Sequence, residues 1–222
     1  MAAAASAVAQ IKDGMVVGLG TGSTSAFIVR LLEAKVREGM RIIGVPTSKR
    51  TADAAQAAGI ALSTLAEHPE LDLAIDGADE VQRGNLQLIK GLGGALLWEK
   101  IVASAAKRFL VIVDETKLVD RLGGRTPVPV EVVSYGWQSA ERRLRALGAK
   151  PVLRKGADGN AFVTDGGHYI LDCTFGPIAS PEALNNDLDH VVGVVEHGLF
   201  INMTSEVHLA APGGVQVLKP GA

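Results

Sequence analysis

The sequence contains little cysteine and few aromatic residues. Among its 222 residues there is one cysteine, Cys173, and aromatic residues make up 4%. A single cysteine cannot form a disulfide within the chain, and no CxxC or HExxH spacing is present to hold a metal ion. We therefore expect a protein of a reducing, cytoplasmic compartment that binds no metal.

The sequence also lacks an excess of one charge and a long apolar run. Lys and Arg number 22 against 24 Asp and Glu, which gives a net charge of -2. This balance indicates neither a nucleic acid nor a membrane as partner. The small apolar residues 1–9 lack the basic start and Leu-rich run of a signal peptide, and we expect a helix there that ends near Gly14. With 47% hydrophobic residues, the chain can bury a full core as a soluble globular protein.

A glycine-rich loop follows the first predicted strand, Met15 to Leu19. It has the sequence Gly18-Leu19-Gly20-Thr21-Gly22-Ser23-Thr24, and helical spacing of apolar residues continues from it to Gly39. Backbone N–H groups at a helix start, together with the hydroxyls of Thr21, Ser23 and Thr24, favour an anion such as a phosphate. A tight turn with one capping hydroxyl is the alternative, but it would explain only one of the three.

The same loop resembles half of a dinucleotide-binding fingerprint. Its third glycine position holds Ser23, however, and the second predicted strand, Arg41 to Val45, ends in Pro46-Thr47-Ser48 where an acid for the ribose is expected. We therefore do not predict NAD.

Two acids follow a buried strand predicted at Leu71 to Ile75. The sequence Asp76-Gly77-Ala78-Asp79 lies where parallel strands end, which is where ligands bind in open α/β sheets. An ordinary Asp-Gly turn is the alternative. Both this segment and the Thr21 loop are expected at one edge of the sheet, so they can share a ligand.

A cation, a glycine loop and a third acid come next. Lys90 precedes Gly91-Leu92-Gly93-Gly94, and a helix is predicted from Ala95 to Arg108. On that helix Glu99 falls among small alanines, away from the face of Lys100, Ser104, Lys107 and Arg108, so we favour a functional carboxylate over one that reaches to water. The next strand, Phe109 to Val113, brings Lys117 to the same edge.

The pattern changes near Gly123 to Pro127, where we predict a domain boundary. Residues 1–126 form a Rossmann-like domain, 127–200 a small α+β domain of strand-helix-strand-strand-helix-strand order, and 201–222 a hairpin that rejoins the first sheet. The small domain includes a hairpin at 161–174 and a last strand at 192–200. Because it shows no cluster of polar residues, we expect it to serve as a subunit contact or a lid.

Four motifs together resemble the A type of ribose-5-phosphate isomerase, nearly end to end. They are Gly20-Thr21-Gly22-Ser23-Thr24, Asp76-Gly77-Ala78-Asp79-Glu80, Lys90-Gly91 followed by Glu99-Lys100, and Pro129-Val130-Glu131-Val132. The resemblance implies an α/β fold, with a Rossmann-like, mostly parallel sheet and a smaller ferredoxin-like domain. It also implies interconversion of ribose 5-phosphate and ribulose 5-phosphate in the non-oxidative pentose phosphate pathway, without metal or cofactor, by a cytoplasmic homodimer or homotetramer.

The resemblance also implies roles for individual residues. Glu99 matches the catalytic base, with Asp76, Asp79 and Lys90 as further catalytic residues. The implied substrate-binding residues are Thr21, Gly22, Ser23, Thr24, Asp76, Gly77, Ala78, Asp79, Lys90, Gly91, Leu92, Gly93 and Lys117. Members commonly carry a basic residue in a longer first helix, whereas no charge precedes Lys12 here, and Leu92 and Trp98 also depart from the family pattern.

The expected chemistry agrees with these residue types. One carboxylate can move a proton between C2 and C1, while a nearby cation stabilises the enediolate. Burial should raise the pKa of Glu99, and Lys90 should lower it again. Two rival functions are a sugar-phosphate-sensing module, which would need no base, and acyl-CoA transfer by a related fold, for which no nucleotide site is evident.

Overall fold

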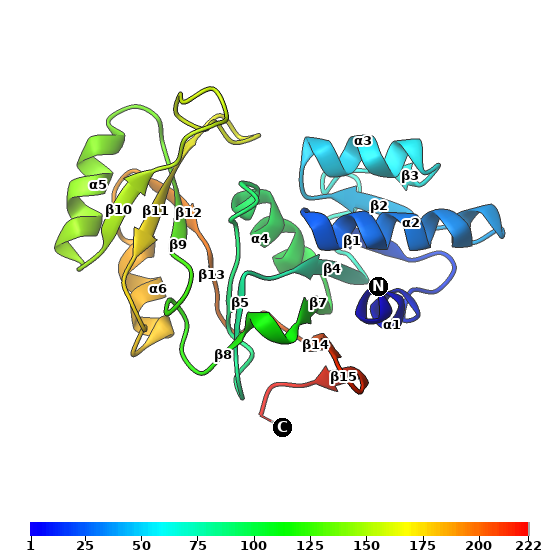
Figure 1. The fold of residues 1–222 in the computed structure, drawn as a ribbon. Coiled ribbons are helices and arrows are strands. Elements are labelled where there is room, and N and C mark those ends of the chain that lie inside the picture. The colour runs from blue at the N-terminus through cyan, green and yellow to red at the C-terminus, as the bar shows by residue number, and fades with distance from the viewer. Residues whose placement is uncertain (222) are drawn as a thin grey trace.

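A computed structural model describes residues 1–221, except for the side chains of Ser23 and Thr24. The two predicted anion-binding hydroxyls of that pair therefore lie outside the described part. Within it, no helix is both long enough and apolar enough to cross a membrane. The chain forms two larger sheets and a third small one between them (Figure 1).

The large sheet has the order β15-β14-β7-β4-β1-β2-β3, and all its neighbours are parallel except β14 and β15. The strands are β1 (Val16–Leu19), β2 (Ile43–Pro46), β3 (Ala61–Leu62), β4 (Leu73–Gly77), β7 (Phe109–Asp114), β14 (Glu206–Ala211) and β15 (Gly214–Leu218). Strand β14 pairs with β7, and β15 pairs with β14, so both strands of this hairpin belong to the large sheet.

Helices cover both faces of the large sheet. Successive side chains of a strand point to opposite faces, so apolar residues on both faces pack against helices. Leu73 and Ile75 of β4 pack in the cluster that includes residues of α1 (Ala2–Val8), α2 (Ser23–Arg37) and α3 (Lys49–Ala57). Ala74, between them, packs in the cluster that includes α4 (Leu96–Ala105). Two apolar layers therefore fix the strands, and the strand ends are left for polar residues.

The small domain is an antiparallel sheet of order β10-β11-β9-β12 with two helices. Its elements are β9 (Val128–Val132), α5 (Trp137–Ala146), β10 (Lys150–Leu153), β11 (Tyr169–Thr174), α6 (Pro181–Asp189) and β12 (Val194–His197). This order confirms the ferredoxin-like prediction. The predicted strand at 161–164 is wrong, since only an isolated bridge joins Ala161 to Lys155.

The third sheet was not predicted. It has the order β13-β6-β5-β8, with β5 (Glu80–Gln82), β6 (Leu88–Ile89), β8 (Leu118–Val119) and β13 (Leu199–Phe200), and η1 (Glu115–Lys117) leads into it. The predicted single strand at 192–200 is therefore divided between two sheets. Strands of two or three residues are too short to show a periodic pattern. Because this sheet draws on both sides of the predicted boundary, the division at residues 126 and 200 stays a proposal.

Three predicted element ends are wrong by a few residues. The first helix ends at Val8 rather than near Gly14, since Gln10 and Ile11 donate to carbonyls three residues back and close a turn. The helix predicted to reach Arg108 ends at Ala105, because the Lys107 N–H pairs with Leu71 and leads into β7. Strand β4 extends to Gly77, so Asp76 lies within the strand rather than after it.

Candidate active site

Asp76, Lys90 and Glu99 form a buried group of charges at the carboxyl edge of the large sheet. They come from β4, from the residue after β6, and from the first turn of α4. Each is at most 4% exposed. Lys90 Nζ lies 2.9 Å from Asp76 Oδ2 and 3.3 Å from Glu99 Oε2, and it also donates to the Gly77 carbonyl oxygen at 2.6 Å. Three residues that the sequence singled out separately therefore form one unit.

Asp76 accepts more hydrogen bonds than Glu99 does. Besides Lys90, it accepts the backbone N–H groups of Gly77 at 2.8 Å and Thr21 at 3.1 Å. Glu99 Oε2 is buried and receives no hydrogen bond within the described residues, since its approach to Lys90 is an ion pair without hydrogen-bond geometry. Glu99 is thus held by fewer hydrogen bonds than Asp76 is.

The pKa values follow from this burial and pairing. Burial raises the pKa of Asp76, and Lys90 only partly opposes the rise. Burial also raises the pKa of Glu99, to about 8, against the pull of Lys90 and with the help of the Asp76 charge. The pKa of Lys90 is raised as well, because attraction to Asp76 and Glu99 outweighs its own desolvation. Burial thus raises the pKa of both acids, and the three hydrogen bonds that Asp76 accepts favour its ionised form more than Glu99 is favoured by its single ion pair.

The glycine loop packs against Asp76 of this charged group. Gly20 donates its N–H to the Ile75 carbonyl at 2.9 Å, and a Cβ at Gly20 would lie 2.2 Å from the Asp76 carboxyl carbon. A side chain at residue 20 would therefore push Asp76 out of place. The Thr21 hydroxyl was predicted to bind an anion, but in the structure it binds other hydroxyl groups. Its oxygen lies 2.8 Å from Thr47 Oγ1 and 2.8 Å from Ser48 Oγ, in a buried hydroxyl cluster.

A cavity of about 120 Å³ opens above the charged group. Its lining contains Thr21, Gly22, Gly77, Ala78, Asp79, Lys90, Gly91, Gly93, Glu99 and Lys117. Most of the predicted site residues are thus brought together. Among the predicted site residues whose side chains are described, two are not on this lining. Asp76 is buried and pairs with Lys90, and Leu92 is 42% exposed, although its N–H donates to Asp79 Oδ2 at 2.9 Å.

An adjoining cavity of about 230 Å³ shares Ala78 and Lys117 with the first. Its other walls include Ala3 and Ala4 of α1 and Phe27 of α2. The first helix therefore faces this cavity with alanines and brings no basic side chain to it. Lys117, which follows β7, is the cation that both cavities share.

The other family departure, Trp98, faces away from the charged group. It lies on α4 and lines an apolar groove with Leu65 and Ile101. Neither Leu92 nor Trp98 is on the lining of the cavity around the charged group, and neither adds a charge to the site.

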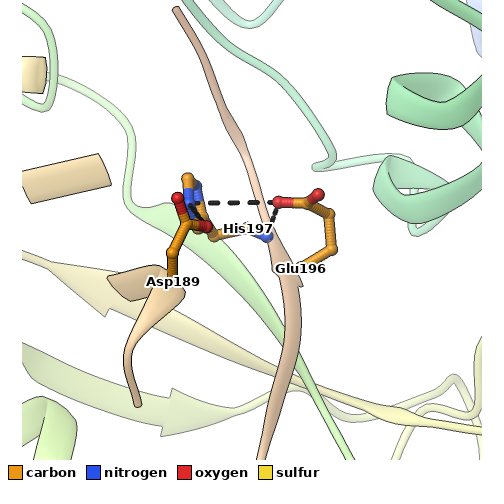
Figure 2. A group of neighbouring side chains, drawn as sticks. All are labelled: Asp189, Glu196 and His197. Atoms are coloured by element: carbon orange, nitrogen blue, oxygen red, sulfur yellow. Dashed lines mark hydrogen bonds and ion pairs between the residues drawn. The ribbon is translucent and has the colours of Figure 1, made fainter. Parts of the chain in front are cut away.

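Sequence reasoning missed a second polar cluster beside the site, formed by Asp189, Glu196 and His197 (Figure 2). The three offer ligand atoms within 4.8 Å of one another. These side chains already have hydrogen-bond partners. Lys100 binds the Glu196 carboxylate, and His197 Nδ1 accepts the Leu199 N–H at 3.3 Å. His197 Nε2 then carries the proton and donates to Asp189 at 3.1 Å. We assign these residues a structural role, connecting α4 to β12 and α6.

Comparison with known proteins points to a single family. The model described as Ribose 5-phosphate isomerase A (phosphoriboisomerase A) matches residues 43–214. A Gloeobacter violaceus protein called ribose-5-phosphate isomerase A is 59% identical over 220 residues, which is 99% of this chain and 95% of the relative. A Gluconobacter oxydans protein of the same name is 58% identical over 219 residues, with 98% and 95% covered.

Solved structures agree with the sequence relatives. The structure of ribose 5-phosphate isomerase A from Methanocaldococcus jannaschii is similar with a TM-score of 0.94 and 41% identity, covering 98% of this chain and 96% of that one. A D-ribose-5-phosphate isomerase in complex with phospho-erythronic acid has a TM-score of 0.94 and 40% identity, with the same coverage.

Proposed function

Because the chain belongs to the ribose 5-phosphate isomerase A family, we propose that it interconverts D-ribose 5-phosphate and D-ribulose 5-phosphate by proton transfer through an enediolate. The observation that carries this proposal is the buried Glu99 carboxylate, 3.3 Å from the Lys90 ammonium, which lines a cavity together with Asp79 and Lys117. This reaction, a step of the non-oxidative pentose phosphate pathway, needs one base and one cation, and it needs no cofactor.

The geometry suggests how each step proceeds on the open-chain sugar. Glu99 removes the proton from C2, and the electron pair of that C–H bond forms the C1–C2 double bond as negative charge moves onto the C1 oxygen. Lys90 has three N–H groups, of which two bind Asp76 and Gly77, so the third is left for the developing oxyanion. The proton of the C2 hydroxyl then passes to the C1 oxyanion, which gives the C1 hydroxyl and moves the negative charge to the C2 oxygen. Glu99 returns its proton to C1 as the C2 oxygen becomes the ketone.

The two aspartates take separate roles in this proposal. Asp79 lines the cavity and is half-buried, so it is placed to hold a sugar hydroxyl or to assist ring opening. Asp76 does not line the cavity, and it acts through Lys90 by fixing the ammonium and holding its charge. A sugar-phosphate-sensing module would need the contacts around Asp79 but not a buried base. The isomerase is therefore the better account of Glu99.

Turnover should be undiminished after exhaustive chelation with EDTA, and product formed in D₂O should carry deuterium at C1. The Lys90 ammonium already supplies positive charge among Asp76, Asp79 and Glu99, and it would repel a divalent cation at those oxygens. A coupled assay with ribose 5-phosphate and NMR of the product provide both measurements. Activity that is lost with EDTA and restored by Mg²⁺ or Mn²⁺ would show that the acids hold a metal instead.

Lys117→Gln should mainly raise KM for ribose 5-phosphate, by roughly 10-fold or more, because a hydrogen bond to a charged group contributes about 1.5–3 kcal/mol in ground and transition states alike. Lys117 is the cation shared by both cavities, where no charge from α1 assists it. The matched control is Lys107→Gln, at the other end of β7, whose side chain is 64% exposed. An unchanged KM with a reduced kcat would place the phosphate elsewhere.

We also propose a cytoplasmic location and a homodimer or homotetramer. The free, buried thiol of Cys173 agrees with a reducing compartment. The assembly state is measured by light scattering on the purified chain, and a monomeric mass would refute that part.

A further inference from the structure

Arg154 of the small domain reaches across to the glycine loop of the active site. It follows β10, and its guanidinium donates to the carbonyl oxygens of Gly91 at 2.9 Å and Leu92 at 3.1 Å. The same group pairs through two contacts with the Asp172 carboxylate on β11, one of them at 2.9 Å. The side chain is 13% exposed. This planar group with its five donors therefore holds two successive peptide groups against a fixed acid.

The two peptide groups that Arg154 holds both lead to the site. The Gly91 carbonyl and the Leu92 N–H belong to one planar peptide, whose N–H donates to Asp79 Oδ2 at 2.9 Å. Arg154 and Asp79 thus hold opposite ends of one peptide. In the next peptide the Leu92 carbonyl faces Arg154, so the Gly93 N–H points the other way. Gly93 lines the cavity with Glu99, and its N–H donates no hydrogen bond to the atoms that the structure describes.

The small domain supports this loop at further points. Gly94 has φ +85°, and a Cβ there would lie 2.5 Å from the Phe162 ring, so the loop and that ring are in close contact. Asp165 accepts the Lys49 N–H at 2.8 Å, which connects the same segment of the small domain to α3. In Figure 1 the segment between β10 and β11 extends from the small sheet toward the large domain. The contacts place the small domain over the active-site loop.

We propose that Arg154 is a positioning residue for the reaction: it orients the Gly91–Gly93 peptides so that Asp79 and the Gly93 N–H face the reacting sugar. This inference rests on the proposed isomerase function. Arg154 touches no substrate itself, and Asp172 fixes its guanidinium. The small domain, which the sequence suggested as a lid or subunit contact, thereby completes the active site of its own chain.

The test is a set of variants at residue 154 assayed with ribose 5-phosphate. In Arg154→Gln and Arg154→Ala, kcat should fall by about 10- to 100-fold with KM within about 3-fold, because a misplacement of about 1 Å in a site can cost about 10²-fold. Arg154→Lys should also lose activity, since one ammonium cannot bind both carbonyls and the carboxylate. Guanidinium ion added to Arg154→Ala should restore part of kcat. The control is Arg145→Ala on α5, whose side chain is 55% exposed and pairs with Glu141.

A second measurement does not depend on activity. Hydrogen exchange of the Leu92 and Gly93 amides should be faster in Arg154→Gln than in the unchanged protein, while exchange in the β1 and β4 strands stays the same. Exchange that is unchanged at the loop, or a kcat equal to that of the Arg145→Ala control, would overturn the positioning role. If the wild-type protein failed to isomerise ribose 5-phosphate, the proposed function would be refuted instead. The hydrogen-exchange result would still decide whether Arg154 orders the loop.

Discussion

Glu99→Gln should lower kcat by at least about 10²-fold while KM for ribose 5-phosphate changes little, because the amide keeps the shape of the side chain but cannot accept the C2 proton. The motivating geometry is a buried carboxylate with one oxygen free of hydrogen bonds, 3.3 Å from the Lys90 ammonium. Steady-state kinetics and binding of a non-reactive analogue measure the two effects separately. The matched control is Glu115→Gln, an exposed acid at the same sheet edge, which should keep full activity.

The pH dependence provides a second measure of the same base. Glu99 must be ionised to act, and its pKa is raised to about 8, so kcat/KM should rise with pH up to about 8 and then level off. In Glu99→Gln the residual kcat/KM should no longer rise with pH in this way. A variant with full activity, or an unchanged limb in the profile of Glu99→Gln, would mean that another residue is the base.

The stability of the protein should fall with rising pH, over the range in which kcat/KM rises. A carboxyl whose folded pKa is raised contributes stability that is fully present below its unfolded value of about 4.3 and is lost as pH rises through the folded value. For Glu99 that window runs from about 4.3 to about 8. Glu99→Gln removes this titration. The unfolding free energy of the variant should therefore increase relative to that of the wild-type protein as pH rises through the window. Urea unfolding at several pH values measures the difference.

The sequence predicted the large sheet and the order of the small domain well, because buried parallel strands and helices leave strong apolar patterns. Glu99 was identifiable because an acid among alanines on a helix is unusual, and Asp76 because an acid ends an apolar run. The pairing of these acids with one ammonium was harder to see. Asp76 and Glu99 are 23 residues apart, and only the packing of β4 against α4 brings both to Lys90.

Other contacts leave no local pattern at all. Arg154 is more than 60 residues from the Gly91 carbonyl that it binds, and in its own segment it is one basic residue beside a strand. Lys100 was grouped with Ser104, Lys107 and Arg108 because helical spacing shows which residues share a face. That spacing does not show whether a second domain covers the face. In the structure Glu196 of β12 does so. Interactions between domains are therefore the part of this site that required the folded structure.

Lys90→Met should have the largest combined effect, because it removes both the oxyanion donor and the partner of two buried acids. We expect kcat to fall by about 10²- to 10³-fold, as is typical for loss of one such donor. We also expect a loss of about 3–5 kcal/mol in unfolding free energy, since breaking a buried ion pair leaves a charge unpaired. Asp76 would retain only the Gly77 and Thr21 N–H groups as partners.

The double variant Lys90→Met/Asp76→Asn separates these two losses. Neutralising Asp76 removes the unpaired charge, so most of the stability should return while kcat stays low, because the donor is still missing. The pH dependence gives a further check. Without Lys90 the folded pKa of Asp76 rises further, so its stabilising contribution is present below about pH 4 and is lost as pH increases, and Lys90→Met should be closest to the unchanged protein in acid. The control is Lys107→Met, an exposed lysine paired with Asp72. If Lys90→Met were as stable as that control at pH 8, the buried pair would contribute nothing to folding, and Lys90 would be retained for the reaction alone.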